Sequence, residues 1–328
     1  MSSAERPVHR QAVLMLLLTT LFWGLSFPLI KAIGLAHQLA LPGSGTWFIT
    51  AYTIAPRFLL ATVVLAAVLR PKRGTFTRGE IKQGLLLGLT AGAGMLLQND
   101  GLQFTSASTS AFLTQLYAIM IPAYLAVRWR RRPLGIVWLC GGLVLAGVAM
   151  LGRFDFRALH LGRGELETLL SSVFFMMQIL VLGQKDYAAN RALPVTLAMF
   201  GTEAVVFAAM AWGTAPNSAA LIAPWTSMPW LGFTVLLTLF CTLGAFILMN
   251  RWQPAITATE AGLIYCIEPV FASLMALFLP ALFSAWAGFD YANERLTWHL
   301  LLGGGLVTVA NVLIQFRPPP ETPAQLRA

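Results

Sequence analysis

The sequence predicts an all-α integral membrane protein with ten transmembrane helices, arranged as two inverted five-helix repeats. Three observations lead to this fold class. Hydrophobic residues make up 57% of the 328 residues and charged residues only 11%, with a mean hydropathy of +0.72, whereas soluble domains are about 25% charged. Apolar segments of about 18 to 23 residues recur along the chain, each long enough to cross a hydrocarbon layer of roughly 30 Å. Finally, proline and glycine patterns of the first half return in the second half.

The predicted spans follow one another with short polar connections. They cover residues 12–33, 52–69, 82–100, 108–127, 134–151, 164–185, 193–212, 228–250, 256–280 and 298–316. The runs are apolar on every face instead of alternating, which excludes barrel strands and leaves helices as the spanning structure. The fourth and fifth spans are separated only by the basic run from Arg128 to Arg132. Residues 1–11 and 317–328 are expected to be tails, and residues 152–163 a linker between the repeats.

The distribution of basic residues predicts the orientation. With ten spans, the loops on the side of the termini hold 16 of the 22 Lys and Arg residues, and the opposite loops hold four. An excess of this size predicts that both termini lie in the cytoplasm. Most of the residues behind the net charge of +9 thus lie in loops next to the membrane, and we expect no nucleic-acid partner. Cys140, Cys241 and Cys266 fall inside separate spans and predict neither a disulfide framework nor a metal cluster, so no cofactor is expected.

The internal repeat is seen when two prolines are aligned. Aligning Pro122 with Pro269 sets LYAIMIPAYLA beside IYCIEPVFASL, and aligning Gly142 with Gly305 sets CGGLVLAGVAML beside GGGLVTVANVLI. The two offsets, 147 and 163 residues, differ by an insertion of 16 residues after the ninth span. Five spans per repeat make the second copy enter from the opposite side, which predicts inverted repeats over residues 12–151 and 164–316. The alternative is a chance alignment of glycine- and proline-containing helices.

Four segments carry a family resemblance. They read FWGLSFPLIKAI, PRFLLATVVLAAVL, GLQFTSASTSAFLTQLYAIMIPAYLA and TATEAGLIYCIEPVFASLMAL. In their order and spacing they resemble the drug/metabolite transporter superfamily, in its ten-helix EamA-type branch, from about Val13 to Gln315. The chain departs from the branch where a Gly-Glu pair often follows the proline helix: here the two halves read RWRRRP and YANERL. It also has a long outer segment, His37 to Tyr52.

The resemblance implies a secondary active transporter in the inner (cytoplasmic) membrane. Such a protein moves a small amino acid-like or drug-like solute by alternating access, with efflux as the expected direction, protons as the candidate coupling ion and membrane lipids as neighbours. A lipid-carrier flippase of the same superfamily is the alternative. A membrane-embedded enzyme is disfavoured because no HExxH, Gly-x-Ser-x-Gly or nucleotide-binding loop occurs and the four histidines are isolated. The sequence does not predict the oligomeric state.

Two acidic residues lie deep in predicted spans and are candidate coupling or substrate-binding groups. An ionisable group at the bilayer centre costs from about 2.5 kcal/mol upward, so it usually has a partner or faces water. Glu268 is about 18 Å along the ninth span and is followed by Pro269, which leaves a carbonyl unpaired and predicts a polar kink. Glu203 lies near the middle of the seventh span. The structural alternatives are a buried ion pair for Glu268 and a packing hydrogen bond for Glu203.

The basic candidates are Lys31 and Arg57, near the outer ends of the first two spans. Together they would form a basic mouth for an anionic group such as a carboxylate. Pro28 precedes Lys31 and predicts a kink in the first span, as in the broken helices around many transporter sites. The alternative for Lys31 is an amine that reaches the headgroups.

The remaining candidates lie within one or two turns of the aligned prolines. Gln115 and Tyr117 in the fourth span, with its kink residue Pro122, and Tyr265 in the ninth are expected to line a midplane cavity, or alternatively to fill helix interfaces. By contrast, Gln98, Asn99 and Asp100 are expected only to end the third span, and Glu260 to meet cytoplasmic water or Arg251.

Overall fold

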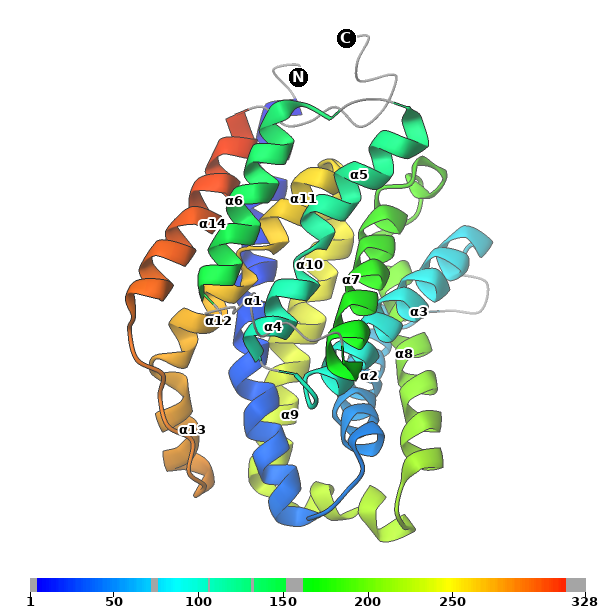
Figure 1. The fold of residues 1–328 in the computed structure, drawn as a ribbon. Coiled ribbons are helices and arrows are strands. Elements are labelled where there is room, and N and C mark those ends of the chain that lie inside the picture. The colour runs from blue at the N-terminus through cyan, green and yellow to red at the C-terminus, as the bar shows by residue number, and fades with distance from the viewer. Residues whose placement is uncertain (1–4, 72–75, 106, 131–132, 152–161, 317–328) are drawn as a thin grey trace.

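The structure is a computed structural model that describes residues 5–71, 76–105, 107–130, 133–151 and 162–316 (Figure 1). Within these ranges the regular secondary structure is entirely helical, which confirms the all-α fold class. Helix occupies each of the ten predicted segments. The tail 317–328, residues 1–4 of the other tail and the linker 152–163, apart from Gly162 and Arg163, lie outside the described residues.

Over the described residues, the bundle consists of seven long helices and three interrupted ones. The uninterrupted helices are α1 (Glu5–Ala40), α2 (Thr46–Leu69), α3 (Arg78–Gly101), α6 (Gly135–Leu151), α7 (Arg163–Leu182), α8 (Ala192–Thr214) and α14 (Trp298–Phe316). The interrupted ones are α4 (Ala107–Thr114) with α5 (Tyr117–Trp129), α9 (Met228–Leu236) with the π-helix η4 (Leu237–Gly244) and α10 (Ala245–Trp252), and α11 (Ala258–Tyr265) with α12 (Glu268–Ala276). Short elements are η1 (Lys185–Tyr187), η2 (Ser218–Leu221), η3 (Ala223–Thr226), η5 (Gln253–Ala255) and α13 (Leu279–Ala287).

Among the described residues, six helical stretches are long and apolar enough to cross a membrane. They are Pro7–Ala40, Thr46–Leu69, Arg163–Leu182, Ala192–Thr214, Met228–Ala255 and Ala258–Ala276, and two shorter apolar helices cover Gly135–Leu151 and Trp298–Ile314. The chain is therefore a multi-pass membrane protein. The α4–α5 segment misses the length criterion because the helix is interrupted at Gln115 and Leu116. Ten membrane crossings, like the inverted repeats, stay a prediction.

Glycines bring helices from the two halves of the chain into close contact. A Cβ atom on Gly84 of α3 would lie 2.4 Å from the Cβ of Ala198 on α8, and one on Gly88 would lie 2.7 Å from the Cβ of Thr202. A Cβ on Gly147 of α6 would similarly lie 2.7 Å from the carbonyl oxygen of Gly303 on α14. The glycines spaced four residues apart in α3 thus serve close helix packing, as their spacing indicates. Helices α3 and α6 of the first predicted repeat therefore pack directly against α8 and α14 of the second.

An ion pair joins the first turn of α3 to Arg191, the residue that precedes α8. The carboxylate of Glu80, whose side chain is 1% exposed, accepts hydrogen bonds from the Arg191 guanidinium, with an Nε–Oε1 distance of 2.7 Å. Glu80 also completes a capping box with Thr77. Hydrogen bonds from Arg191 lower the pKa of the Glu80 carboxyl to about 2. The pair fixes α3 against α8 at the end of α3 that precedes its apolar segment.

The described ends of the chain lie at the same end of the bundle. The first turn of α1, the last turn of α14 and the end of α5 all lie at the top of Figure 1. Helix α1 runs from that end to the opposite one, and the breaks in α4–α5 and α11–α12 lie between the two ends. The breaks in these helices therefore lie at mid-depth in the bundle, where non-helical backbone can line an internal cavity.

Candidate substrate cavity

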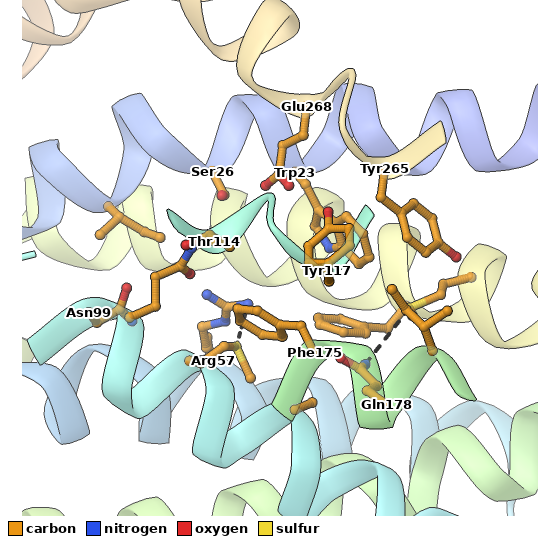
Figure 2. Close-up of a pocket in the computed structure, with 17 residues that line it drawn as sticks. Trp23, Ser26, Arg57, Asn99, Thr114, Tyr117, Phe175, Gln178, Tyr265 and Glu268 are labelled. Carbon is orange, nitrogen blue, oxygen red and sulfur yellow. Dashed lines mark hydrogen bonds between the residues drawn. The ribbon is translucent and has the colours of Figure 1, made fainter. Parts of the chain in front are cut away.

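Two helix breaks face each other in the centre of the bundle. Helix α4 ends at Thr114 and α5 begins at Tyr117, while α11 ends at Tyr265 and α12 begins at Glu268. Residues of both turns, Thr114 and Tyr117 at one and Tyr265 and Glu268 at the other, line the same cavity (Figure 2). The cavity has a volume of about 110 Å³. Backbone that leaves the helical pattern inside a membrane protein is tolerated where it is buried in protein or lines such a cavity.

Of the three predicted kink residues, one lies at a break. Pro269 is the second residue of α12, in the first turn, where its missing N–H costs no intrahelical hydrogen bond. Pro122 lies inside α5, beyond its first turn, and the break comes before it at Gln115 and Leu116. Helix α1 continues through Pro28 to Ala40 without an interruption.

Glycines allow the helices to close around the cavity. A Cβ atom on Gly24 of α1 would lie 2.6 Å from the Cβ of Phe271, so its absence lets α12 approach α1. A Cβ on Gly94 of α3 would lie 2.6 Å from the ring of Phe175, which lines the cavity from α7. In each place a larger side chain would push a cavity-forming helix outward.

Arg57 and Glu268 enter the cavity from opposite sides. The Arg57 side chain, on α2, is 4% exposed. Its Nη2 lies 3.9 Å from the sulfur of Met95, its guanidinium carbon lies 4.8 Å from the ring centroid of Phe58, and its Nε has no hydrogen-bond partner. Within the described ranges no carboxylate forms an ion pair with it. Glu268, the first residue of α12, points toward Arg57 from the other wall (Figure 2). A buried cation without an ion-pair partner is costly, so a bound anionic group would be favourable there.

Amide and hydroxyl groups form the polar part of the lining. Gln98 donates from Nε2 to the Thr114 hydroxyl at 3.1 Å, and Asn99 lines the cavity beside it. These residues lie in the last turn of α3, as expected, but Gln98 and Asn99 also line the cavity, which the expectation that they only end the span did not include. Asp100, the next residue, faces α7 and pairs with Arg163.

Aromatic rings form the apolar walls. The ring of Trp23 meets the ring of Tyr265 at a centroid distance of 5.2 Å and that of Phe246 at 5.5 Å, both edge-on. The Tyr265 hydroxyl donates to Oε1 of Gln253 at 2.9 Å, which fixes its orientation. Edge-to-face pairs of this kind add about 0.5 to 1.5 kcal/mol beyond the buried area. The walls are consequently preorganised for a flat or branched apolar group.

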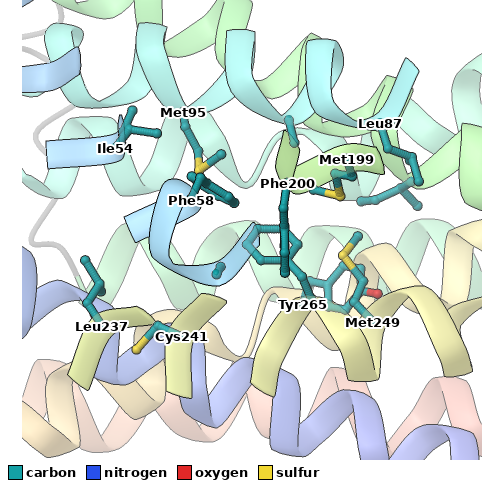
Figure 3. Close-up of a cluster of buried hydrophobic side chains, with 14 of the residues drawn as sticks. Ile54, Phe58, Leu87, Met95, Met199, Phe200, Leu237, Cys241, Met249 and Tyr265 are labelled. Atoms are coloured by element: carbon teal, nitrogen blue, oxygen red, sulfur yellow. The ribbon is translucent and has the colours of Figure 1, made fainter. Parts of the chain in front are cut away.

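Behind the cavity lies a tightly packed apolar cluster (Figure 3). Phe58 of α2, Phe200 of α8 and Phe246 of α10 have ring centroids 5.6 to 6.1 Å apart. Met95, Met199 and Met249 fill the space around them. This cluster holds α2 and α8 rigidly, so the backbone that carries Arg57 is well supported.

The structure brings four of the seven predicted site residues to the cavity. Arg57, Tyr117, Tyr265 and Glu268 line it. Lys31 does not: Trp23, Ser26 and Ile30 form the cavity face of α1, whereas Lys31 is exposed, with its Nζ 5.1 Å from the ring centroid of Tyr291. The predicted basic mouth of Lys31 and Arg57 is therefore not formed in this structure.

Gln115 and Glu203 are buried outside the cavity lining. Gln115 lies in the turn between α4 and α5, 3% exposed, and its Oε1 has no hydrogen-bond partner. Glu203 on α8 is 0% exposed, and neither of its carboxyl oxygens has a hydrogen-bond partner.

Glu260 differs from its predicted surroundings. It was expected to meet cytoplasmic water or Arg251, but it is fully buried, and its Oε1 lies 2.9 Å from Nε2 of His9 at the start of α1. The pair joins α1 to the first turn of α11. No sequence pattern indicated this pair, because the two residues are 251 positions apart.

Several lining residues were missed. Trp23, Ser26, Phe175 and Gln178 line the cavity without having been singled out. A signal existed for Gln178, since an amide in the middle of an apolar span usually faces the bundle interior. The aromatic residues gave none, because their sequence positions suit lipid, interface and cavity equally.

The fold and the cavity define a class of protein: a multi-pass α-helical membrane protein with a cavity inside its bundle that is lined by charged, polar and aromatic side chains. The sequence model of the EamA-like transporter family matches residues 10–153, so this part of the chain is similar to that family. An uncharacterized transporter from Archaeoglobus fulgidus is 23% identical over 330 residues, covering 96% of this chain and 89% of the relative. A crystal structure with 14% sequence identity has the same fold, with a TM-score of 0.67 over 94% of this chain and 97% of that one. These comparisons show what the chain is similar to: a transporter family model over residues 10–153, and a relative named as an uncharacterized transporter over nearly its whole length.

Proposed function

We propose that the chain is a secondary active transporter that exports a small amino acid-like solute across the cytoplasmic membrane by alternating access. The solute binds in the central cavity with its anionic group on Arg57 and its amino group on Glu268. The observation that supports this assignment is the position of these two side chains, which face each other across the cavity without an ion pair between them. A solute with both charges would neutralise both at once.

The walls define the rest of the solute. Trp23, Tyr117 and Phe175 favour an apolar or aromatic side chain, and the Asn99 amide offers a hydrogen bond at the edge. A purely cationic drug-like solute fits this cavity less well, because it would bring a second positive charge close to Arg57. A lipid would have to leave its acyl chains outside a site lined by two charges.

The energy is proposed to come from a proton gradient. No nucleotide-binding loop occurs in the sequence. Glu268 faces the cavity and can exchange a proton with its water when the amino group of the solute is absent. Movement of helices around the two facing breaks would open the cavity alternately to either side, as expected for discontinuous helices. The common end of α1 and α14 in Figure 1 supports placing both termini on one side, which we assign to the cytoplasm.

The test is transport into proteoliposomes. Radiolabelled amino acids, nucleosides and cationic drugs are offered with and without an imposed pH gradient to the wild type, Glu268→Gln and Arg57→Gln. We expect gradient-dependent transport of an amino acid, lost in both variants. Lys31→Met is the matched control, since Lys31 is a charged residue outside the cavity.

Two results would contradict the proposal. Transport of a cationic drug that persists in Arg57→Gln would show that an anionic group is not bound there. Failure to move any of these solutes, together with transbilayer movement of a fluorescent phospholipid, would favour the flippase alternative.

A further inference from the structure

We infer that α11 is the gate that closes the cavity on the side of the chain termini, and that contacts at its two ends hold it shut. This inference rests on the proposed alternating access and deepens it by naming the element that moves on that side. Helix α11 is only eight residues long. It lies between the break at the cavity and the end of the bundle where α1 begins (Figure 1).

A buried pair holds the first turn of α11. Nε2 of His9, near the start of α1, lies 2.9 and 3.1 Å from the two carboxyl oxygens of Glu260. The Glu260 side chain is fully buried. Its backbone N–H donates to the Thr257 hydroxyl at 3.2 Å, which caps the helix. Separating a buried carboxyl from its partner is costly, so this contact favours the position of α11 against α1.

A chain of hydrogen bonds holds the other end of α11. The Tyr265 hydroxyl donates to Oε1 of Gln253 at 2.9 Å, and Nε2 of Gln253 donates to the carbonyl oxygen of Ile179 on α7 at 2.7 Å. All three residues are buried. Between the two ends, Gly262 lets α11 approach α5, since a Cβ atom there would lie 2.8 Å from Cδ1 of Ile121. Helix α11 is thus fixed to α1, α5 and α7.

The two ends of the cavity differ in burial. Figure 2 shows Tyr265 and Gln178 toward one end and Asn99 toward the other. Tyr265, Gln178 and Met249 are buried, whereas Gln98 and Asn99 are partly exposed. The end beside α11 is therefore sealed, and the cavity is more accessible to water at the opposite end. The described structure corresponds to the state in which the gate is closed.

The backbone on both sides of α11 allows this helix to move as a unit. Ile256 and Thr257 precede it, and Cys266 and Ile267 follow it, all outside regular helix. Segments of this kind can absorb the change of backbone angles in a hinge. Tyr265 belongs both to the cavity wall and to the hydrogen-bond chain, so a solute in the cavity acts directly on the gate.

The native thiol of Cys266 reports the position of α11. It is 0% exposed, and its Sγ donates to the carbonyl oxygen of Gly262 at 3.2 Å, so α11 has to move before a reagent reaches it. The test is the rate of its alkylation by a membrane-impermeant maleimide, followed by peptide mass spectrometry. The rate is measured in vesicles with the termini outside and in vesicles with the termini inside, as shown by protease access to a C-terminal tag.

Two variants weaken the two ends of the gate separately. His9→Phe removes the contact with Glu260, and Gln253→Leu interrupts the hydrogen-bond chain. We expect each to raise the alkylation rate roughly 2- to 10-fold above the wild type, the factor that about one hydrogen bond contributes to an equilibrium, and only from the side of the termini. Glu80→Gln is the matched control, because it also breaks a buried carboxylate pair but lies outside α11; its rate should equal that of the wild type.

Any of three results would overturn the inference: an unchanged rate in either variant, an equal increase in Glu80→Gln, or an increase from the side opposite the termini. If either variant does not fold, hydrogen exchange of the wild type decides. The backbone amides of α11 should then exchange faster than those of α8, because α11 opens without global unfolding. Exchange in α11 as slow as in α8 contradicts the inference.

These outcomes separate the inference from the proposed function. Amino acid transport in a protein whose Cys266 alkylation is unchanged in the variants would reject the gate and keep the transporter. Faster alkylation in both variants, in a protein that transports none of the tested solutes, would keep the moving helix and reject the proposed substrate.

Discussion

Replacing Glu80 by glutamine tests whether the ion pair between α3 and α8 stabilises the fold. Glu80 is 1% exposed, and its two oxygens accept hydrogen bonds from Nε and Nη2 of Arg191 at 2.7 and 3.0 Å. One of those oxygens also accepts the backbone N–H of Thr77 at 2.9 Å. Glutamine keeps the size of the side chain but removes its charge and one acceptor.

The pKa of Glu80 gives the magnitude. Its hydrogen bonds with Arg191 lower it from 4.5 to about 2, and a full shift of that size corresponds to about 3 kcal/mol. The Arg191 side chain is 56% exposed, so water screens the pair. We therefore expect Glu80→Gln to lower the free energy of unfolding by about 1 to 2 kcal/mol at neutral pH.

The sign of the pH dependence follows from the lowered pKa. A carboxyl with a lower pKa in the folded state contributes its stability above the unfolded value of 4.5 and loses it as the pH falls through about 2. The difference in melting temperature between wild type and Glu80→Gln in detergent should be full at neutral pH and shrink below about pH 4. A double-mutant cycle with Arg191→Gln isolates the pair. Equal melting temperatures at neutral pH, or a difference that does not change in acid, would refute the reasoning.

Three further predictions concern single positions in the bundle. Gly88→Ala should lower stability by about 1 to 3 kcal/mol, because its Cβ would lie 2.7 Å from a side-chain carbon of α8; thermal melting checks this, and Gly34→Ala, with nothing within 4 Å of the added Cβ, should not be destabilised. Tyr265→Phe removes the 2.9 Å hydrogen bond to Gln253 and should cost about 0.5 to 1.5 kcal/mol in melting experiments, with weaker solute binding in a competition assay. Lys31→Met should leave the rate and affinity of transport unchanged at equal membrane abundance, since Lys31 does not line the cavity; a large loss of transport would contradict the placement.

Hydropathy was enough to predict the helical segments, because every helix that is surrounded by lipid needs a long apolar run. It did not predict the break before Pro122, since Gln115 and Leu116 carry no helix-breaking signal in the sequence. There, packing around the cavity decides where the helix is interrupted. By contrast, Pro269 marks its break correctly, because a proline tolerated in the first turn of a helix favours a start just before it.

The sequence alone predicted the two charged residues of the cavity. Arg57 and Glu268 were found because an ionisable group in the membrane needs a reason to be there. Lys31 was misplaced because depth along a span does not give the direction of a side chain around the helix axis. Gln98 and Asn99 were passed over because polar residues near a span end look alike whether they face water outside or a cavity inside.

The glycine contacts between α3 and α8 and between α6 and α14 also set an order for biosynthesis. The faces of Gly84, Gly88 and Gly147 have their partners on helices that the ribosome makes only later. Until α8 and α14 are inserted, these faces of the first half can meet only lipid or a chaperone. The nascent first half is therefore expected to wait in the membrane, loosely packed, and to reach its final structure only after the last helix has been synthesised.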